Sequence, residues 1–187
     1  MNQEEQLYDY CMANHLGRGF NKSWGIKHFQ LLIDNLMPNE KLASVFIGMH
    51  NYISATKHDN YYAFGITDKR IICAQKGVIG ENVQSIKWTN INDITLDKGL
   101  MIGVVEIDTY KETVRVGVAK SDAQNIYDSI MDVHDKLERK KLKASQTHPV
   151  QSSDNNFEKL KQLKELLDMG IITKDEFELK KKQLLGL

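Results

Sequence analysis

The chain has 187 residues, which is enough for one ordinary domain with short appendages. Its composition, 41% hydrophobic and 27% charged, is that of a folded protein and argues against general disorder. Lys plus Arg and Asp plus Glu both number 25, so binding to nucleic acid or to an anionic membrane would need a local patch rather than overall charge. No apolar run reaches the length of a membrane-spanning helix, and the acidic, polar start lacks a secretory signal. We therefore expect a soluble protein of the cytoplasm.

The first 37 residues are predicted to form a helical extension. Four apolar residues, Ile26, Phe29, Ile33 and Leu36, recur at helical spacing and give one apolar stripe, and residues 4–16 form an earlier helix. The Lys-Ser pair at residues 22–23 lacks the preceding glycines of a phosphate-binding P-loop. The segment between the helices is therefore interpreted as a linker.

Short β-rich runs separated by turn signals follow, a pattern typical of an antiparallel sandwich or barrel. In the last run, Val114, Val116 and Val118 alternate with other residues, so one face of this strand should be buried. The loop after the first run, residues 51–60, is the longest and most polar. The seven predicted strands are residues 41–49, 61–67, 70–76, 83–88, 91–96, 101–108 and 113–118.

An amphipathic helix is predicted after the last strand. Ser121 and Gln124 have the spacing of a capping box, in which each side chain satisfies a free backbone donor of the other residue. Apolar residues then recur at helical spacing, as in a helix that lies on a core. These residues are Ile126, Ile130, Val133 and Leu137.

A strongly basic run follows this stripe. We interpret it as the C-terminus of the helix, where cations complement the helix macrodipole. A patch that binds anions is the alternative. The cations of the run are Arg139, Lys140, Lys141 and Lys143.

Polar residues around Pro149 are interpreted as a linker. The predicted organisation is therefore a helical extension (residues 1–37), a body of strands with a capping helix (38–143), a polar linker (144–153) and a C-terminal tail (154–187).

Seven antiparallel strands capped by one C-terminal helix form the architecture of the pleckstrin-homology-like (PH-like) barrel, so the predicted fold class is α+β. Four short motifs strengthen this resemblance: residues 38–41 (Pro-Asn-Glu-Lys), 62–72 (Tyr-Ala-Phe-Gly-Ile-Thr-Asp-Lys-Arg-Ile-Ile), 76–80 (Lys-Gly-Val-Ile-Gly) and 85–86 (Ser-Ile). They are similar to bacterial PH-like domains of Bacillus-type bacteria and their phages.

The family's lipid-binding pattern is missing from this chain. PH domains that bind phosphoinositides use several cations on the first two strands and the loop between them. In this chain the corresponding residues, 40–67, include only two Lys or Arg residues, Lys41 and Lys57, and the acidic Asp59 lies near them in the sequence. Binding to an anionic headgroup needs several clustered cations, so lipid is the weaker alternative.

The tail has the signals of two helices joined by a tight stop. Gly170 is placed to end the first helix in the left-handed conformation. Thr173 and Glu176 have the spacing of a capping box for the second helix, and Ile172 and Phe177 occupy the positions of a hydrophobic staple around it. The sequence therefore predicts a helical hairpin.

Residues 163–177 and 180–186 resemble the short C-terminal (SHOCT) domain, which ends many bacterial proteins. The resemblance implies a role in oligomerisation or partner contacts. A hairpin of fewer than about 40 residues rarely buries enough surface to be stable alone, so its apolar side chains should dock on the body, on another copy or on another protein. The residues that we expect at this interface are Leu163, Leu166, Leu167, Ile171, Ile172, Phe177, Leu184 and Leu185.

No catalytic or cofactor-binding motif stands out, and no cofactor or metal is expected. His50, His58 and Asp59 flank the first inter-strand loop and could meet in space, but a solvated loop is favoured over a metal site. Cys73 lies in an apolar run and is interpreted as a small buried hydrophobe. The aromatic residues, including Trp24, are scattered and are interpreted as core or packing residues, so no nucleic acid partner is expected.

The predicted function is that of a non-enzymatic interaction or assembly module. Its hairpin would mediate oligomerisation with itself or docking to another protein, and its barrel would be the ligand-recognition scaffold. Peripheral membrane association through the basic run and the barrel is the alternative. An unrecognised hydrolase that uses the first-loop histidines is the third.

Overall fold

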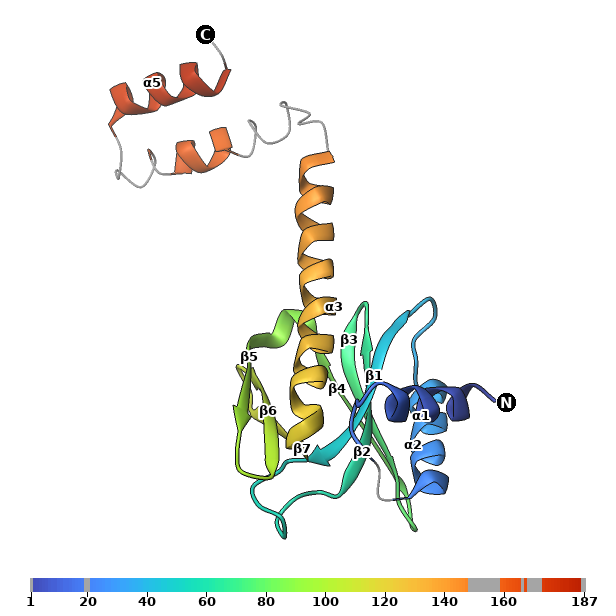
Figure 1. Ribbon diagram of the computed structural model, residues 1–187. Helices are drawn as coiled ribbons and strands as arrows, with labels where there is room; N and C mark the ends of the chain where they lie inside the picture. Colours follow the sequence, from blue (N-terminus) through green and yellow to red (C-terminus); the bar gives the residue numbers. More distant parts are fainter. Residues whose placement is uncertain (1, 19–20, 148–158, 166, 168–172, 186–187) are drawn as a thin grey trace. The chain divides into compact units, whose positions relative to one another are not determined.

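The computed structural model describes residues 2–18, 21–147, 159–165, 167 and 173–185 (Figure 1). The chain forms two compact units, Met1–Arg139 and Lys140–Leu187. The first unit holds two N-terminal helices, the strands and most of a long helix. Among the described residues, no helix combines the length and the apolar character that a membrane span requires.

Seven antiparallel strands form one sheet, as predicted, and β2 and β3 begin and end at the predicted residues. A short 3-10 helix, η1 (Trp88–Asn90), separates β4 from β5. The strands are β1 (Leu42–His50), β2 (Tyr61–Thr67), β3 (Arg70–Lys76), β4 (Glu81–Lys87), β5 (Ile91–Lys98), β6 (Ile102–Thr109) and β7 (Thr113–Ala119).

The sheet is open rather than closed into a barrel. Its order is β4-β3-β2-β1-β7-β6-β5, so β4 and β5 are its edges, and no ladder joins them within the described residues. The two halves meet at a short join, where Met49 pairs with Gly117 and His50 pairs with Val116. A side chain at Gly117 would not fit, because its Cβ would lie 2.5 Å from the ring of Tyr52. The predicted barrel is therefore corrected to an open, bent sheet.

One hydrophobic core joins the sheet to the helices that flank it. Phe46 of β1 and Phe64 of β2 are buried and stacked, with ring centroids 4.5 Å apart. Ile126 and Ile130 of the long helix α3 (Lys120–Thr147) are completely buried in the same core. The predicted role of this helix as a cover for the core is confirmed.

The N-terminal extension forms two helices, α1 (Gln3–Ala13) and α2 (Lys22–Asp34), as predicted. Asn21 caps α2, because its side-chain oxygen accepts hydrogen bonds from the amides of Ser23 and Trp24 at 2.9 and 3.4 Å. The Lys-Ser pair at residues 22–23 therefore begins a helix, and the Ser23 amide is bonded to the Asn21 cap.

The buried stripe of α2 is displaced from the predicted one. Ile26, Ile33 and Leu36 are only half-buried. Gly25 is buried because α1 approaches closely there, and a Cβ at this position would lie 2.6 Å from the ring of Tyr8. Hydrophobic periodicity misses such a stripe because it contains a glycine and a histidine. Its members include Gly25, His28, Phe29 and Leu32.

The predicted capping box of α3 is wrong. The helix begins at Lys120, so Ser121 and Gln124 both lie inside it. The Ser121 hydroxyl donates a hydrogen bond to Asp122 at 2.8 Å, and the Gln124 amide donates one to Asp128 at 2.7 Å. Both side chains therefore make local contacts along the helix instead of capping it.

The end of α3 also differs from the prediction. The helix continues through residues 144–147, which the sequence pattern assigns to the linker, and its last turn holds no basic residue. Residues 138–146 are rich in good helix formers, which explains the extension. Because the macrodipole acts within the last turn, the predicted pairing of the basic run with this dipole is wrong.

The C-terminal tail contains helical residues 159–165 and 167 and the helix α5 (Lys174–Leu185). The predicted capping box of α5 is confirmed: Glu176 accepts a hydrogen bond from the Thr173 amide at 2.9 Å, and Thr173 Oγ1 accepts one from the Glu176 amide at 3.3 Å. Hydrogen bonds from the Thr173 amide and hydroxyl lower the pKa of the Glu176 carboxyl. The predicted stop at Gly170 and the staple residue Ile172 lie outside the described residues.

Candidate functional site

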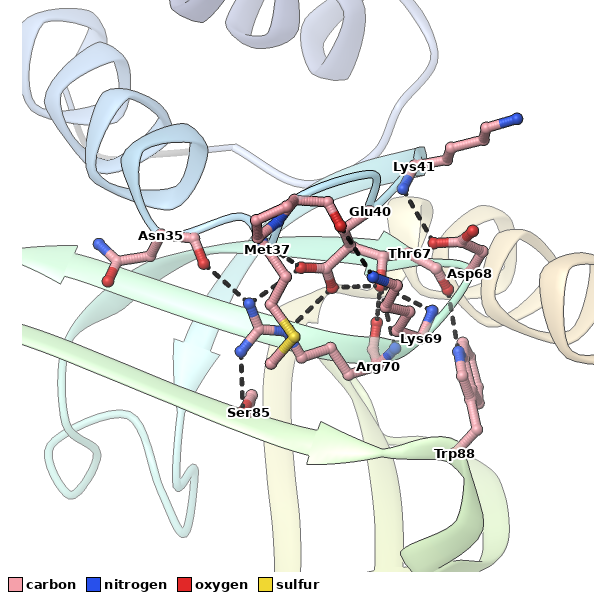
Figure 2. A network of polar contacts seen from close by, with 11 residues as sticks. Asn35, Met37, Glu40, Lys41, Thr67, Asp68, Lys69, Arg70, Ser85 and Trp88 are labelled. Atoms are coloured by element: carbon pink, nitrogen blue, oxygen red, sulfur yellow. Dashed lines mark hydrogen bonds and ion pairs between the residues drawn. The ribbon is translucent and has the colours of Figure 1, made fainter.

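Two of the motifs that resemble bacterial PH-like domains, residues 38–41 and the Thr-Asp-Lys-Arg turn (67–70) of residues 62–72, meet in one buried polar network (Figure 2). Arg70 Nε donates to Glu40 Oε1 at 2.9 Å, and Arg70 Nη2 donates to Glu40 Oε2 at 3.0 Å. The Glu40 side chain is fully buried, and only 10% of the Arg70 side chain is exposed. The guanidinium also donates to the Asn35 carbonyl at the end of α2 and to the Ser85 hydroxyl of β4. This ion pair therefore ties the end of α2 to β3 and β4.

Thr67 completes the network from the turn between β2 and β3. Its hydroxyl donates to Glu40 Oε1 at 2.7 Å and accepts hydrogen bonds from the amides of Lys69 and Arg70. Its carbonyl accepts a hydrogen bond from the indole of the buried Trp88 at 2.9 Å. Because these groups are satisfied inside the protein, the two motifs serve the fold rather than a ligand.

The network changes the acidity of Glu40. Burial by itself raises the pKa of this carboxyl. Hydrogen bonds from Arg70, from the Met37 amide at 2.7 Å and from Thr67, together with the Arg70 charge, outweigh burial and lower the pKa to about 2. Glu40 is therefore ionised over the whole neutral and mildly acidic range.

Glu40 makes the stability of the body depend on pH. Its folded-state pKa lies below the ordinary value of 4.5, so its contribution is complete above that value and is lost as the pH falls towards 2. The gap between the unfolding free energies of the wild type and of Glu40→Gln is therefore expected to change with pH. It should shift by about 3 kcal/mol, against the wild type, between neutral pH and about pH 2. Urea denaturation of both proteins at several pH values measures this gap. A gap that stays constant would show that Arg70 does not hold Glu40 ionised.

A groove lies between α2 and the hairpin of β3 and β4. It consists of two adjoining hollows of about 490 and 510 Å³, which share Trp24 and the hairpin residues 76–78 as walls. Trp24 is half-buried and packs beside His28, so of the two roles predicted for it, core or packing residue, it has the second. Beside the groove, at the tip of the hairpin, Val78 and Ile79 are 90% and 96% exposed. The groove and the exposed hairpin tip together form a candidate apolar surface on the body.

His28 gives the groove a directional polar group. Its Nδ1 accepts a hydrogen bond from the Lys76 amide at 3.0 Å, so the ring proton of the neutral form resides on Nε2. Burial lowers the pKa of His28 to about 4, so the ring is neutral at neutral pH. Nearby, Lys27 Nζ lies 4.8 Å from the Trp24 ring centroid. The groove therefore offers an aromatic ring, a neutral imidazole and two cations, Lys27 and Lys76, of which Lys76 is paired with Glu81.

Sequence reasoning missed this groove. Its walls come from α2 and from a hairpin about fifty residues later, and the docking of one on the other has no local signal. One hint was available: Val78 and Ile79 stand between Gly77 and Gly80, at a turn where polar residues are the rule.

The first inter-strand loop brings together only part of the predicted constellation. His50 Nδ1 lies 3.2 Å from Asp59 Oδ2, and the His50 ring is buried against Tyr62. His58 instead accepts a hydrogen bond from the Asn60 amide at 3.0 Å. In the described part of the chain, no group of three or more His, Cys, Asp or Glu side chains has an arrangement that could hold a metal ion.

The two cysteines are buried free thiols. Burial raises the pKa of Cys11 and of Cys73 to about 12, so neither thiol ionises at neutral pH. The prediction that Cys73 is a buried hydrophobe is confirmed.

The remaining predicted site residues lie on α3 and in the tail. The basic run, Arg139, Lys140, Lys141 and Lys143, is exposed along α3. In the tail, Leu163, Leu167 and Phe177 are half-buried. Leu166, Ile171 and Ile172 lie outside the described residues, as do the side chains of the helical residues Leu184 and Leu185.

An open antiparallel sheet of seven strands, followed by a long helix that covers its core, defines a PH-like protein. Residues 36–132, just over half of the chain, match the bacterial PH domain family, and the chain belongs to this family. Residues 158–185 match the short C-terminal domain. Both resemblances seen in the sequence are therefore confirmed. Together the two domains, which are of typically non-catalytic kinds, make a small interaction or binding module.

Solved structures of similar fold are distant from this chain. The Vps36 N-terminal PH domain is 14% identical, with 56% of this chain and 86% of that domain aligned and a TM-score of 0.45. A pleckstrin-homology protein of the DUF1696 family from Shewanella loihica PV-4 is 18% identical, with coverages of 56% and 91% and a TM-score of 0.40. The C-terminal domain of an unknown protein from Leishmania infantum is 17% identical, with coverages of 58% and 92% and a TM-score of 0.42. A search of curated proteins finds no match.

Proposed function

We propose that this protein is a non-enzymatic assembly module in which the C-terminal hairpin joins one copy of the chain to another. In this proposal, the PH-like body is the scaffold that recognises a ligand, and the groove between α2 and the β3–β4 hairpin is its recognition surface. The groove suits a ligand with an apolar segment that covers Trp24 and an acceptor for the His28 Nε2 proton.

The main support for this proposal is that the described side chains of the tail are not buried. Of the described tail side chains, at residues 159–165, 167 and 173–183, none is buried. Leu179 is 61% exposed, and Phe177 is half-buried, with Lys181 Nζ 5.8 Å from its ring centroid. A helix as short as α5, with 12 residues, is marginal in water without tertiary contacts. The hairpin therefore needs a further surface on which to bury its apolar side chains.

A second copy of the chain is a sufficient source of that surface. Burying one large apolar side chain contributes roughly 1.5–3 kcal/mol, and a symmetric contact counts each side chain twice. A micromolar dimer has a total binding free energy of about 8 kcal/mol. A few tail side chains are therefore enough to hold two copies together.

The double substitution Leu167→Asp with Phe177→Asp, here called the hairpin variant, is expected to weaken self-association of the full chain by at least 100-fold, because it places four charges in a symmetric apolar contact. Light scattering at micromolar concentration measures the loss as a lower mass. The matched control is Gln162→Asp with Gln183→Asp, which adds the same charge to exposed positions of the same two helices. If the hairpin variant keeps the wild-type mass, or if the wild type is monomeric, self-assembly through the hairpin is the wrong role.

A further inference from the structure

The two edges of the sheet differ in how well they resist pairing with another strand. Edge strands of monomeric proteins are usually protected by charges, bulges or proline. The β5 edge carries Asp93, Asp97 and Lys98, and its register with β6 is interrupted between Ile91 and Asp93. The β5 edge is therefore protected by two of the usual devices.

The β4 edge lacks these protections. Its seven residues pair with β3 in one uninterrupted register, and the five central residues, at positions 82–86, are uncharged. All of β4 is exposed except Ile86, which is half-buried. The strand is also held in place, because Ser85 accepts a hydrogen bond from Arg70 (Figure 2). An edge with an uninterrupted register and an uncharged centre is a template for an added strand.

The charges at the two ends of β4 select the partner. When two copies of β4 pair antiparallel about Gln84, Glu81 of each copy lies opposite Lys87 of the other, on the same face of the extended sheet. Within its own chain, Lys87 pairs across the ladder with Arg70, a like charge, and makes no ion pair among the described residues. A second copy would supply the anion that Lys87 lacks.

We propose that β4 is a second self-association site, at which two copies pair antiparallel about Gln84 and join their sheets into one continuous sheet. This contact is separate from the hairpin, so the hairpin variant retains it. The partner at this edge is another copy of the chain, because in this register the acidic end of one β4 strand lies opposite the basic end of the other.

Charge reversal tests the register directly. The full-length hairpin variant is the background, and its mass is measured by sedimentation velocity at high micromolar concentration. Glu81→Lys and Lys87→Glu each place two like-charged pairs in the dimer, and each is expected to raise the dimer Kd about tenfold or more. An equimolar mixture of the two variants restores two opposite-charged pairs and is expected to form a heterodimer at least as stable as the background dimer.

Two controls separate this pairing from other effects. Lys111→Glu and Glu112→Lys change the net charge by the same amounts at exposed positions of the β6–β7 turn, and neither they nor their mixture should change the mass. Thermal melting checks that Glu81→Lys still folds, because it removes the exposed ion pair between Lys76 and Glu81. A monomeric background, charge variants that stay dimeric, or a mixture that stays monomeric would each overturn the β4 proposal. None of these outcomes depends on whether the hairpin associates.

Discussion

Replacing Arg70 with methionine is expected to lower the free energy of unfolding by about 3–5 kcal/mol, because it leaves the Glu40 carboxylate buried without its cation. Arg70 donates two hydrogen bonds to Glu40, at 2.9 and 3.0 Å, and a third to the Asn35 carbonyl at the end of α2. The substitution therefore removes the charge that holds Glu40 ionised and the tie between helix and sheet. Urea denaturation at neutral pH measures the loss.

The double variant Glu40→Met with Arg70→Met separates the two contributions. Replacing both members of a buried ion pair by apolar side chains is often close to neutral, so most of the stability should return. Lys69→Met is the control in the same turn, because its exposed ammonium makes one hydrogen bond within the described residues, to the Pro38 carbonyl. We expect it to change stability by less than about 0.5 kcal/mol. A loss below about 1 kcal/mol for Arg70→Met would mean that the network does not hold the body together.

The strands whose ends are predicted best are those whose composition itself favours a β-strand. The runs of β2 and β3 are β-branched and aromatic and are bounded by turn residues, so their ends coincide with the predicted ones. The start of β4 at Glu81 precedes the predicted start because its first two residues are polar. Only their pairing with β3, Lys76 with Glu81 among others, shows that they belong to the strand. Backbone pairing of this kind leaves no trace in hydrophobic periodicity.

The polar network shows a different limit of sequence reasoning. Both of its motifs are recognisable in the sequence as turn segments, yet Glu40 and Arg70 are thirty residues apart. Their meeting depends on the register of β1 with β2, which sets Leu42 opposite Thr67. The two motifs can be recognised in a single sequence, but the register that brings them together cannot. In the tail the contacts are local, and there the capping box of Thr173 and Glu176 was predictable from spacing alone.

Replacing Ile130 with alanine is expected to lower the free energy of unfolding by roughly 2–5 kcal/mol. Its side chain is completely buried, and the neighbouring Ser129 anchors the same turn of α3 to β1 through a hydrogen bond of 2.6 Å to Ser44. Because this anchor limits how far the helix can move to fill the space, much of the cavity should remain, and the loss should include the cavity contribution as well as the lost burial. Urea denaturation at neutral pH measures the loss.

Asp132→Ala is the matched control for this prediction, since Asp132 lies on the exposed side of the same helix. It should change stability by less than about 0.5 kcal/mol. Because Ile130 lies in the unit Met1–Arg139, the hairpin variant should show the same loss on Ile130→Ala as the wild type. A loss below about 0.5 kcal/mol would mean that α3 does not cover the core of the sheet, and the body would then need another element to close it.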